Sequence, residues 1–219
     1  MKICFKCNTL FERHFDLGLI KVCPVKDCYG DVVEIDDNIF HPIQTLNNKG
    51  YITDFCCSGH LWGGSPYIVF DEMVNKNCFD TYPGGFLPSE FGTKAYISRT
   101  IKNKDVLFKQ RELNKSAYEL LKWSEELSVA KIMSVSFSPK NNLRNDSLVK
   151  MIEFELNLFY LSDFTIEGVL SYDFVSIVTP DTAITLSKKI KDFADREQLD
   201  DSIEVSEHNS DELFNSVFG

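Results

Sequence analysis

The 219-residue sequence predicts an α+β fold in which a small metal-binding module precedes a mixed domain of helices and strands. Two cysteine pairs lie within the first 28 residues, and helix and strand periods then follow one another without an internal repeat. Acidic residues gather towards the carboxyl end. We therefore expect a zinc ribbon at residues 1–35, an α+β ligand-binding domain at 36–196 and an acidic tail at 197–219.

The amino-terminal module is predicted from the pairs Cys4/Cys7 and Cys23/Cys28, which have two and four residues between their cysteines. Four thiolates fill a tetrahedral shell around Zn2+, and these short spacings let each pair offer both sulfurs. A closed shell of this kind leaves no position for water, so we expect a structural zinc ion. The same sulfurs would also hold iron, and the sequence does not separate the two metals.

Disulfide bonds are the alternative use of these cysteines. The first residues lack the charged, apolar and small-residue pattern of an export signal, which predicts a reducing, cytoplasmic location and free thiols. No apolar run approaches the roughly 18 residues that a membrane-spanning helix needs, so we expect no membrane segment.

The net charge of −10 is distributed unevenly along the chain. Residues 192–212 hold nine acids against one arginine, so the remainder is close to neutral. A near-neutral body excludes a broad surface for duplex nucleic acid, which requires clustered Lys and Arg, but it permits a local anion pocket. We expect a solvated acidic tail; alternatively, residues 210–218 form a short helix that docks on the body, on a second copy or on a protein partner.

Hydrophobic period and punctuation place the elements of the central domain. Asp36 or Asp37 opens a helix that Gly50 ends, and dense Pro and Gly over 79–93 predict a surface loop. Residues 148–161 fit both the helix and the strand period, so their assignment stays open. The ranges assigned to helices are 38–48, Asn114 to Leu127, and 180–194. The ranges assigned to strands or extended chain are 51–57, 66–70, 94–101, 105–109, 132–137 and 172–178.

The segment that follows the first of these strands concentrates polar and thiol groups. Alternate residues of a strand share a face, so Thr53 and Cys57 are expected on one side and Cys56 on the other. Ser58 and Gly59 can turn backbone N–H groups towards an anion, because glycine permits positive φ. A phosphate or carboxylate would fit such a turn.

His60 and Trp62 extend this candidate site. A histidine near its ordinary pKa can donate a hydrogen bond or carry a proton, and an indole beside small residues can stack on a flat ligand such as a nucleobase. The candidate ligand-binding residues are therefore Thr53, Cys57, Ser58, Gly59, His60 and Trp62.

Other readings of the same residues stay open. The segment can be a tight hairpin with a hydrogen-bonded histidine, and Cys57 with His60 can be a nucleophile and its base. Cys56, Cys57, His60 and Cys78 can instead form a second metal site, although opposite-facing cysteines reduce the usable ligands. Without such roles, Cys56 and Cys78 are expected to be buried free thiols.

The paired cysteines and the run from Gly50 and Tyr51 through Cys56-Cys57-Ser58-Gly59-His60 resemble uncharacterised zinc-ribbon proteins of bacteria and phages, over roughly residues 1–70. The inner run also resembles the Thr-x-x-Cys-Ser-Gly-Arg region of the wybutosine-synthesis methyltransferase family, which modifies transfer RNA with S-adenosylmethionine. That resemblance implies a binding region at Thr53, Cys57, Ser58 and His60. His60 stands at the position of the family's arginine, so a permanent charge is replaced by a titratable ring.

The function we expect is that of a zinc-stabilised cytoplasmic binding protein for a small anionic, nucleotide-derived ligand, and the resemblance to phage proteins suggests a counter-defence role. The alternative is an RNA-modifying enzyme that uses S-adenosylmethionine, although the chain has no glycine fingerprint for a nucleotide cofactor. A third class is a protein-binding adaptor that acts through the acidic tail.

Overall fold

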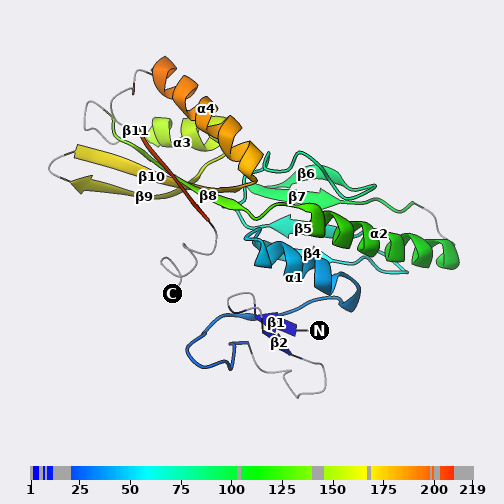
Figure 1. The fold of residues 1–219 in the computed structure, drawn as a ribbon. Helices are drawn as coiled ribbons and strands as arrows, with labels where there is room; N and C mark the ends of the chain where they lie inside the picture. The colour runs from blue at the N-terminus through cyan, green and yellow to red at the C-terminus, as the bar shows by residue number, and fades with distance from the viewer. Residues whose placement is uncertain are drawn as a thin grey trace.

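The computed structural model describes residues 2–4, 7, 9–11, 21–102, 105–139, 146–166, 169–197, 199 and 203–209 (Figure 1). Within this part of the chain it confirms the α+β class, with four α-helices and three antiparallel sheets. The strand orders of the sheets are β2-β1-β3, β4-β5-β7-β6 and β11-β8-β10-β9.

The first sheet is a small ribbon of β1 (Lys2–Cys4), β2 (Leu10–Phe11) and β3 (Val32–Glu34). β1 is central and pairs antiparallel with both neighbours. Ile3 and Ile35 are fully buried and belong to the same hydrophobic core as the rest of the chain. Apolar packing therefore attaches the ribbon to the body, in addition to the chain connection.

The second sheet carries helices α1 (Phe40–Asn48) and α2 (Val106–Glu126) on one face (Figure 1). A short 3-10 turn, η2 (Asp37–Ile39), precedes α1, and Gly50 follows it with a φ of 88°, so the predicted helix and its stop are confirmed. The strands of this sheet are β4 (Thr53–Cys57), β5 (Tyr67–Phe70), β6 (Leu87–Phe91) and β7 (Lys94–Ser98).

Helix α2 begins earlier than the sequence pattern predicts. The expected extended segment at 105–109 and the expected cap at Asn114 are both wrong, because Asp105 caps the helix by accepting a hydrogen bond from Phe108 N at 2.7 Å. The first turns extend beyond the core, and Leu107 is 81% exposed. Apolar residues that do not face the core give no helical stripe, which explains the misplaced start.

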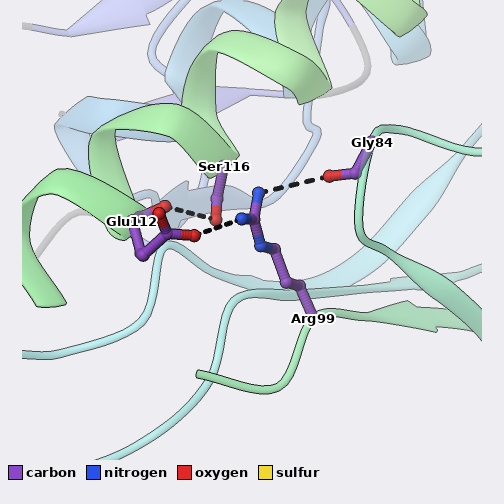
Figure 2. A network of polar contacts seen from close by, with 4 residues as sticks. All are labelled: Gly84, Arg99, Glu112 and Ser116. Carbon is purple, nitrogen blue, oxygen red and sulfur yellow. Dashed lines mark hydrogen bonds and ion pairs between the residues drawn. The ribbon is translucent and has the colours of Figure 1, made fainter. Parts of the chain in front are cut away.

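The predicted loop at 79–93 is partly a strand, since β6 occupies its second half. Pro88 is tolerated there because β6 is an edge strand, where a missing N–H need not break a ladder. Arg99, just after β7, anchors the remaining loop: Nη1 donates to Gly84 O at 3.2 Å, and Nη2 pairs with Glu112 of α2 (Figure 2). Ser116 Oγ donates to Glu112 O at 2.7 Å in the same network.

The third sheet completes a β-α-β-β-α-β unit, with both of its helices on one face (Figure 1). Its strand order, β11-β8-β10-β9, with every pair antiparallel, is the ferredoxin-like arrangement. Thr179 Oγ1 accepts a hydrogen bond from Thr182 N, which confirms the predicted cap of α4. The elements are β8 (Lys131–Phe137), α3 (Asp146–Leu156), β9 (Phe159–Ile166), β10 (Val169–Val178), α4 (Pro180–Glu197) and β11 (Ile203–Asn209).

The ambiguous range 148–161 contains both kinds of element. Helix α3 ends at Leu156, Asn157 takes a φ of 51°, and β9 begins at Phe159. Asparagine adopts this left-handed conformation more readily than most residues, so it ends the helix and redirects the chain.

Strand β11 corrects the expectation of a solvated tail for residues 203–209. It pairs with β8 along its whole length, with Val205 opposite Val135. Exposed Glu204 and Glu207 charge this edge strand, which discourages pairing with another chain. The predicted docking helix at 210–218 lies outside the described residues.

The two α+β halves are joined through Asn75, which is 3% exposed. Its backbone N–H donates to Ile177 O at 3.0 Å, and its Nδ2 contacts Leu156 O, Asn157 O and Ser176 Oγ at 3.1–3.3 Å. One hydrophobic core runs through both halves. Among the described residues, no helix has the length and apolar character required to span a bilayer.

Candidate functional site

The four ribbon cysteines converge as predicted. Their sulfurs all lie within 4.8 Å of one another, with Cys4 and Cys28 3.5 Å apart and Cys7 and Cys23 also 3.5 Å apart. A disulfide bond would be about 2.0 Å long, whereas zinc–sulfur bonds of about 2.3 Å separate tetrahedral sulfurs by about 3.8 Å. The four are free thiols whose arrangement can hold a metal ion.

Backbone hydrogen bonds shape the two knuckles around these sulfurs. Cys4 N donates to Thr9 O at 3.1 Å in the first, and Cys28 N donates to Val25 O at 3.1 Å in the second. Cys23 N reaches Gly30 O at 2.7 Å, closing the second knuckle on itself. These local turns direct the four sulfurs towards one another.

The thiols differ in acidity. Burial opposes ionisation of Cys7, but hydrogen bonds with Thr9 and the neighbouring Cys28 and Cys23 thiols outweigh it and lower the pKa of Cys7 to about 6. Burial instead raises the pKa of Cys23. Near neutral pH, Cys7 therefore ionises more readily than Cys23. The thiolate is the form that binds a metal.

Thr53, one of the predicted ligand-binding residues, is buried in the structure. Thr53 is 3% exposed and makes two hydrogen bonds with Asn47 of α1, at 2.9 and 3.1 Å. A β-bulge lies between Thr53 and Phe55, so the simple alternation of faces fails and Phe55 is exposed while Thr53 is buried. Thr53 thus connects β4 to α1.

The predicted anion turn is formed, but the protein's own groups occupy its donors. Ser58 N and Ser58 Oγ donate to Asp36 Oδ2 at 2.9 and 3.0 Å, and Gly59 N donates to Cys57 Sγ at 3.3 Å. A bound phosphate would have to displace the Asp36 carboxylate. This finding favours a different location for an anionic ligand.

The remaining predicted residues surround the same turn. Cys57 Sγ lies 3.4 Å from His60 Nε2, and Trp62 is 87% exposed beyond them. Cys56 packs against the core, where burial raises its pKa to about 12, and Cys78 is fully buried. Of the four residues considered for a second metal site, only Cys57 and His60 therefore meet.

The third member of this group is Asp36, which sequence reasoning assigned only to the start of a helix. Asp36, Cys57 and His60 bring ligand atoms within 4.8 Å of one another. No spacing pattern links Asp36 with the other two across the intervening helix and strand, so only the fold reveals this arrangement.

A cleft with a volume of about 550 Å³ lies elsewhere, between the two α+β halves. None of the six predicted ligand-binding residues lines it. Its walls combine acidic, basic and aromatic side chains. The lining residues are Glu72, Val74, Lys76, Thr93, Lys150, Glu153, Phe154, Asn157, Leu158 and Phe159.

Comparison with known proteins gives no family for this chain. No protein-family model, curated protein or solved structure matches this chain. The resemblances to zinc-ribbon proteins and to the methyltransferase family stay predictions.

Proposed function

We propose that this chain is a zinc-stabilised binding protein that takes a small nucleotide-like ligand in the cleft between its two α+β halves. The observation that carries the proposal is the cleft itself, because ligand sites are concave and occur preferentially where two structural units meet. Its volume of about 550 Å³ is within the range of small-molecule sites.

The lining chemistry suits a nucleotide-like molecule. Phe154 is 84% exposed and offers a ring on which a base can stack, while Lys76 and Lys150 offer ammonium groups to a phosphate or carboxylate. Glu72 and Glu153 can accept hydrogen bonds from ribose hydroxyl or amino groups. The cleft therefore favours a flat ligand that carries both polar and charged groups.

Zinc is the metal we assign to the ribbon. Four converging thiolates suit a soft or borderline ion in a tetrahedral shell, and four protein ligands leave no position for substrate, so the ion is structural. Metal analysis of freshly purified protein tests this assignment, since iron bound to the same sulfurs would be coloured and zinc would not. Iron in place of zinc would contradict it.

Calorimetric titration tests the ligand proposal with AMP, ADP, S-adenosylmethionine and inorganic phosphate as separate probes. If a base stacks on Phe154, Phe154→Ala removes about 1–3 kcal/mol of binding energy, or roughly 5- to 150-fold in affinity. Lys150→Ala should weaken phosphate-containing probes most, because it removes a charge-assisted contact. Tyr118→Ala and Lys122→Ala are matched controls on the exposed surface of α2, away from the cleft lining.

The outcomes separate the hypotheses. Binding of a nucleotide that weakens in both cleft variants and not in the controls supports the proposal. Binding unchanged by both cleft variants contradicts it, as does the absence of any heat with all four probes at millimolar concentration.

The mixed charge of the cleft also favours the alternative function. S-adenosylmethionine carries an adenine and a zwitterionic amino-acid group, for which Lys150 and Glu153 offer opposite charges. Selective binding of this probe, followed by methyl transfer to transfer RNA, would favour the enzyme over the binding protein. The counter-defence role and the adaptor role remain predictions from the sequence.

A further inference from the structure

A second group of metal-ligating side chains lies outside both the ribbon cysteines and the cleft. Asp36, Cys57 and His60 present a carboxylate oxygen, a sulfur and a ring nitrogen within 4.8 Å of one another. Asp36 follows soon after β3 of the ribbon, Cys57 ends β4, and His60 lies in the next turn. The fold therefore brings together three ligand types that zinc uses in proteins.

The distances are close to those of a coordinated ion. Zinc binds sulfur at about 2.3 Å and nitrogen or oxygen at about 2.0–2.2 Å, which places tetrahedral ligand atoms roughly 3.3–3.8 Å apart. The separation of 3.4 Å between Cys57 Sγ and His60 Nε2 is within this range. The Asp36 carboxylate oxygen lies within 4.8 Å of both atoms, so a small side-chain rotation can complete the set.

Neighbouring donors already orient these side chains. Both hydrogen bonds from Ser58 use Asp36 Oδ2, so the second carboxylate oxygen can bind an ion without breaking them. Gly59 N donates to Cys57 Sγ at 3.3 Å, and such a bond favours the thiolate. Hydrogen bonds of this outer kind are typical of metal sites, where they hold the ligands in position.

A cysteine nucleophile with a histidine base explains the cluster less well. Acyl transfer needs backbone N–H groups free to stabilise an oxyanion, and the Ser58 and Gly59 amides already donate to Asp36 and Cys57. Burial raises the pKa of Cys57, which disfavours a free thiolate. A bound metal ion would reverse that disadvantage because it stabilises the thiolate directly.

The cluster leaves room for a further ligand. His60 is exposed and Cys57 is half-buried, so the side of the cluster that faces solvent is accessible. Tyr67 lies opposite Cys57 in the sheet, and its ring is 5.9 Å from that of Tyr96. An ion held by three protein groups would thus have one open coordination position, as catalytic zinc sites do. The rings of Tyr67 and Tyr96 would lie near that position.

We propose that Asp36, Cys57 and His60 form a second site for a zinc-type divalent ion, with one coordination position open to solvent. The proposal is independent of the cleft function, because none of the three residues lines the cleft. It also gives the ribbon a positioning role, since the chain that leaves the ribbon carries Asp36.

Metal titration of the full-length, reduced protein tests the proposal. Co2+ is the probe, and native mass spectrometry counts the ions bound per chain. Wild-type protein should bind two ions per chain. Cys57→Ser and His60→Ala should retain the ribbon ion and lose the second, while Ser58→Ala should weaken the second site roughly 10- to 100-fold, as loss of an outer hydrogen bond does.

Matched controls use the neighbouring residues of the same types. Cys56→Ser changes the adjacent cysteine that packs against the core, and His41→Ala changes an exposed histidine on α1. Both should still bind two ions. Because His60 is exposed, His60→Ala should have the same midpoint of urea unfolding as wild-type protein. This measurement separates loss of the metal site from loss of the fold.

Two results overturn the proposal. One is a wild-type protein that binds a single ion, which leaves only the ribbon site. The other is a second ion that survives in both Cys57→Ser and His60→Ala. Neither result affects the nucleotide titration of the cleft.

Discussion

Replacement of Gly59 by alanine tests the geometry of the turn that carries Cys57 and His60. Gly59 has a φ of +80°, where an L-residue pays about 1–2 kcal/mol. A Cβ at this position would lie 2.7 Å from Leu113 Cδ2 and 2.9 Å from Pro66 Cδ. The leucine end can move, but the proline ring is fixed to the backbone, so overpacking adds about 1–3 kcal/mol. We expect Gly59→Ala to lower the free energy of unfolding by about 2–5 kcal/mol.

Two other glycines separate these contributions. Gly92 has a φ of +64° with nothing within 4 Å of an added Cβ, so Gly92→Ala should cost only the conformational part, about 1–2 kcal/mol. Gly63 has open space and no positive φ, so Gly63→Ala should stay within about 0.5 kcal/mol of wild type. Urea unfolding followed by tryptophan fluorescence measures all three. If Gly59→Ala costs no more than Gly92→Ala, the close packing of the turn against Pro66 is wrong.

Three further predictions concern the core, the carboxyl end and the thiols. Asn75→Ala should cost about 1–3 kcal/mol for each buried acceptor left unpaired, measured by thermal unfolding against the exposed control Asn114→Ala; equal losses would contradict the role of the buried amide. Deletion of 203–219 should lower the unfolding midpoint because β8 loses one of its two partner strands, whereas an unchanged midpoint would support the original expectation of a solvated tail. In metal-free protein, iodoacetamide should label Cys7 at pH 7 and more slowly as the pH falls below about 6, since only the thiolate reacts; Cys56, whose pKa burial raises to about 12, should stay unlabelled, and peptide mass mapping showing the reverse order would refute these acidities.

Elements with strong local signals were predictable from the sequence. The helix ended by Gly50 and the helix opened by Thr179 are confirmed, because capping and stopping depend on residues next to one another in the chain. The start of α2 and the strand β6 were missed, because exposed apolar residues and an edge proline obscure the period. The strand β11 was missed because its acids suggested a solvated segment, while its pairing with β8 depends on a partner far away in the sequence.

The convergence of the four ribbon cysteines was predictable from the sequence alone, because each knuckle is a local turn and these short cysteine spacings are typical of metal-binding modules. The surroundings of the predicted ligand site were not predictable from the sequence. A bulge in β4 turned Thr53 inward, and Asp36 and Cys57 accept the hydrogen bonds of the two turn amides that were predicted to bind an anion. The cleft is formed by two segments that are more than 50 residues apart in the sequence. Such features arise from packing between distant elements, and no local pattern of residue types encodes which side chains will meet there.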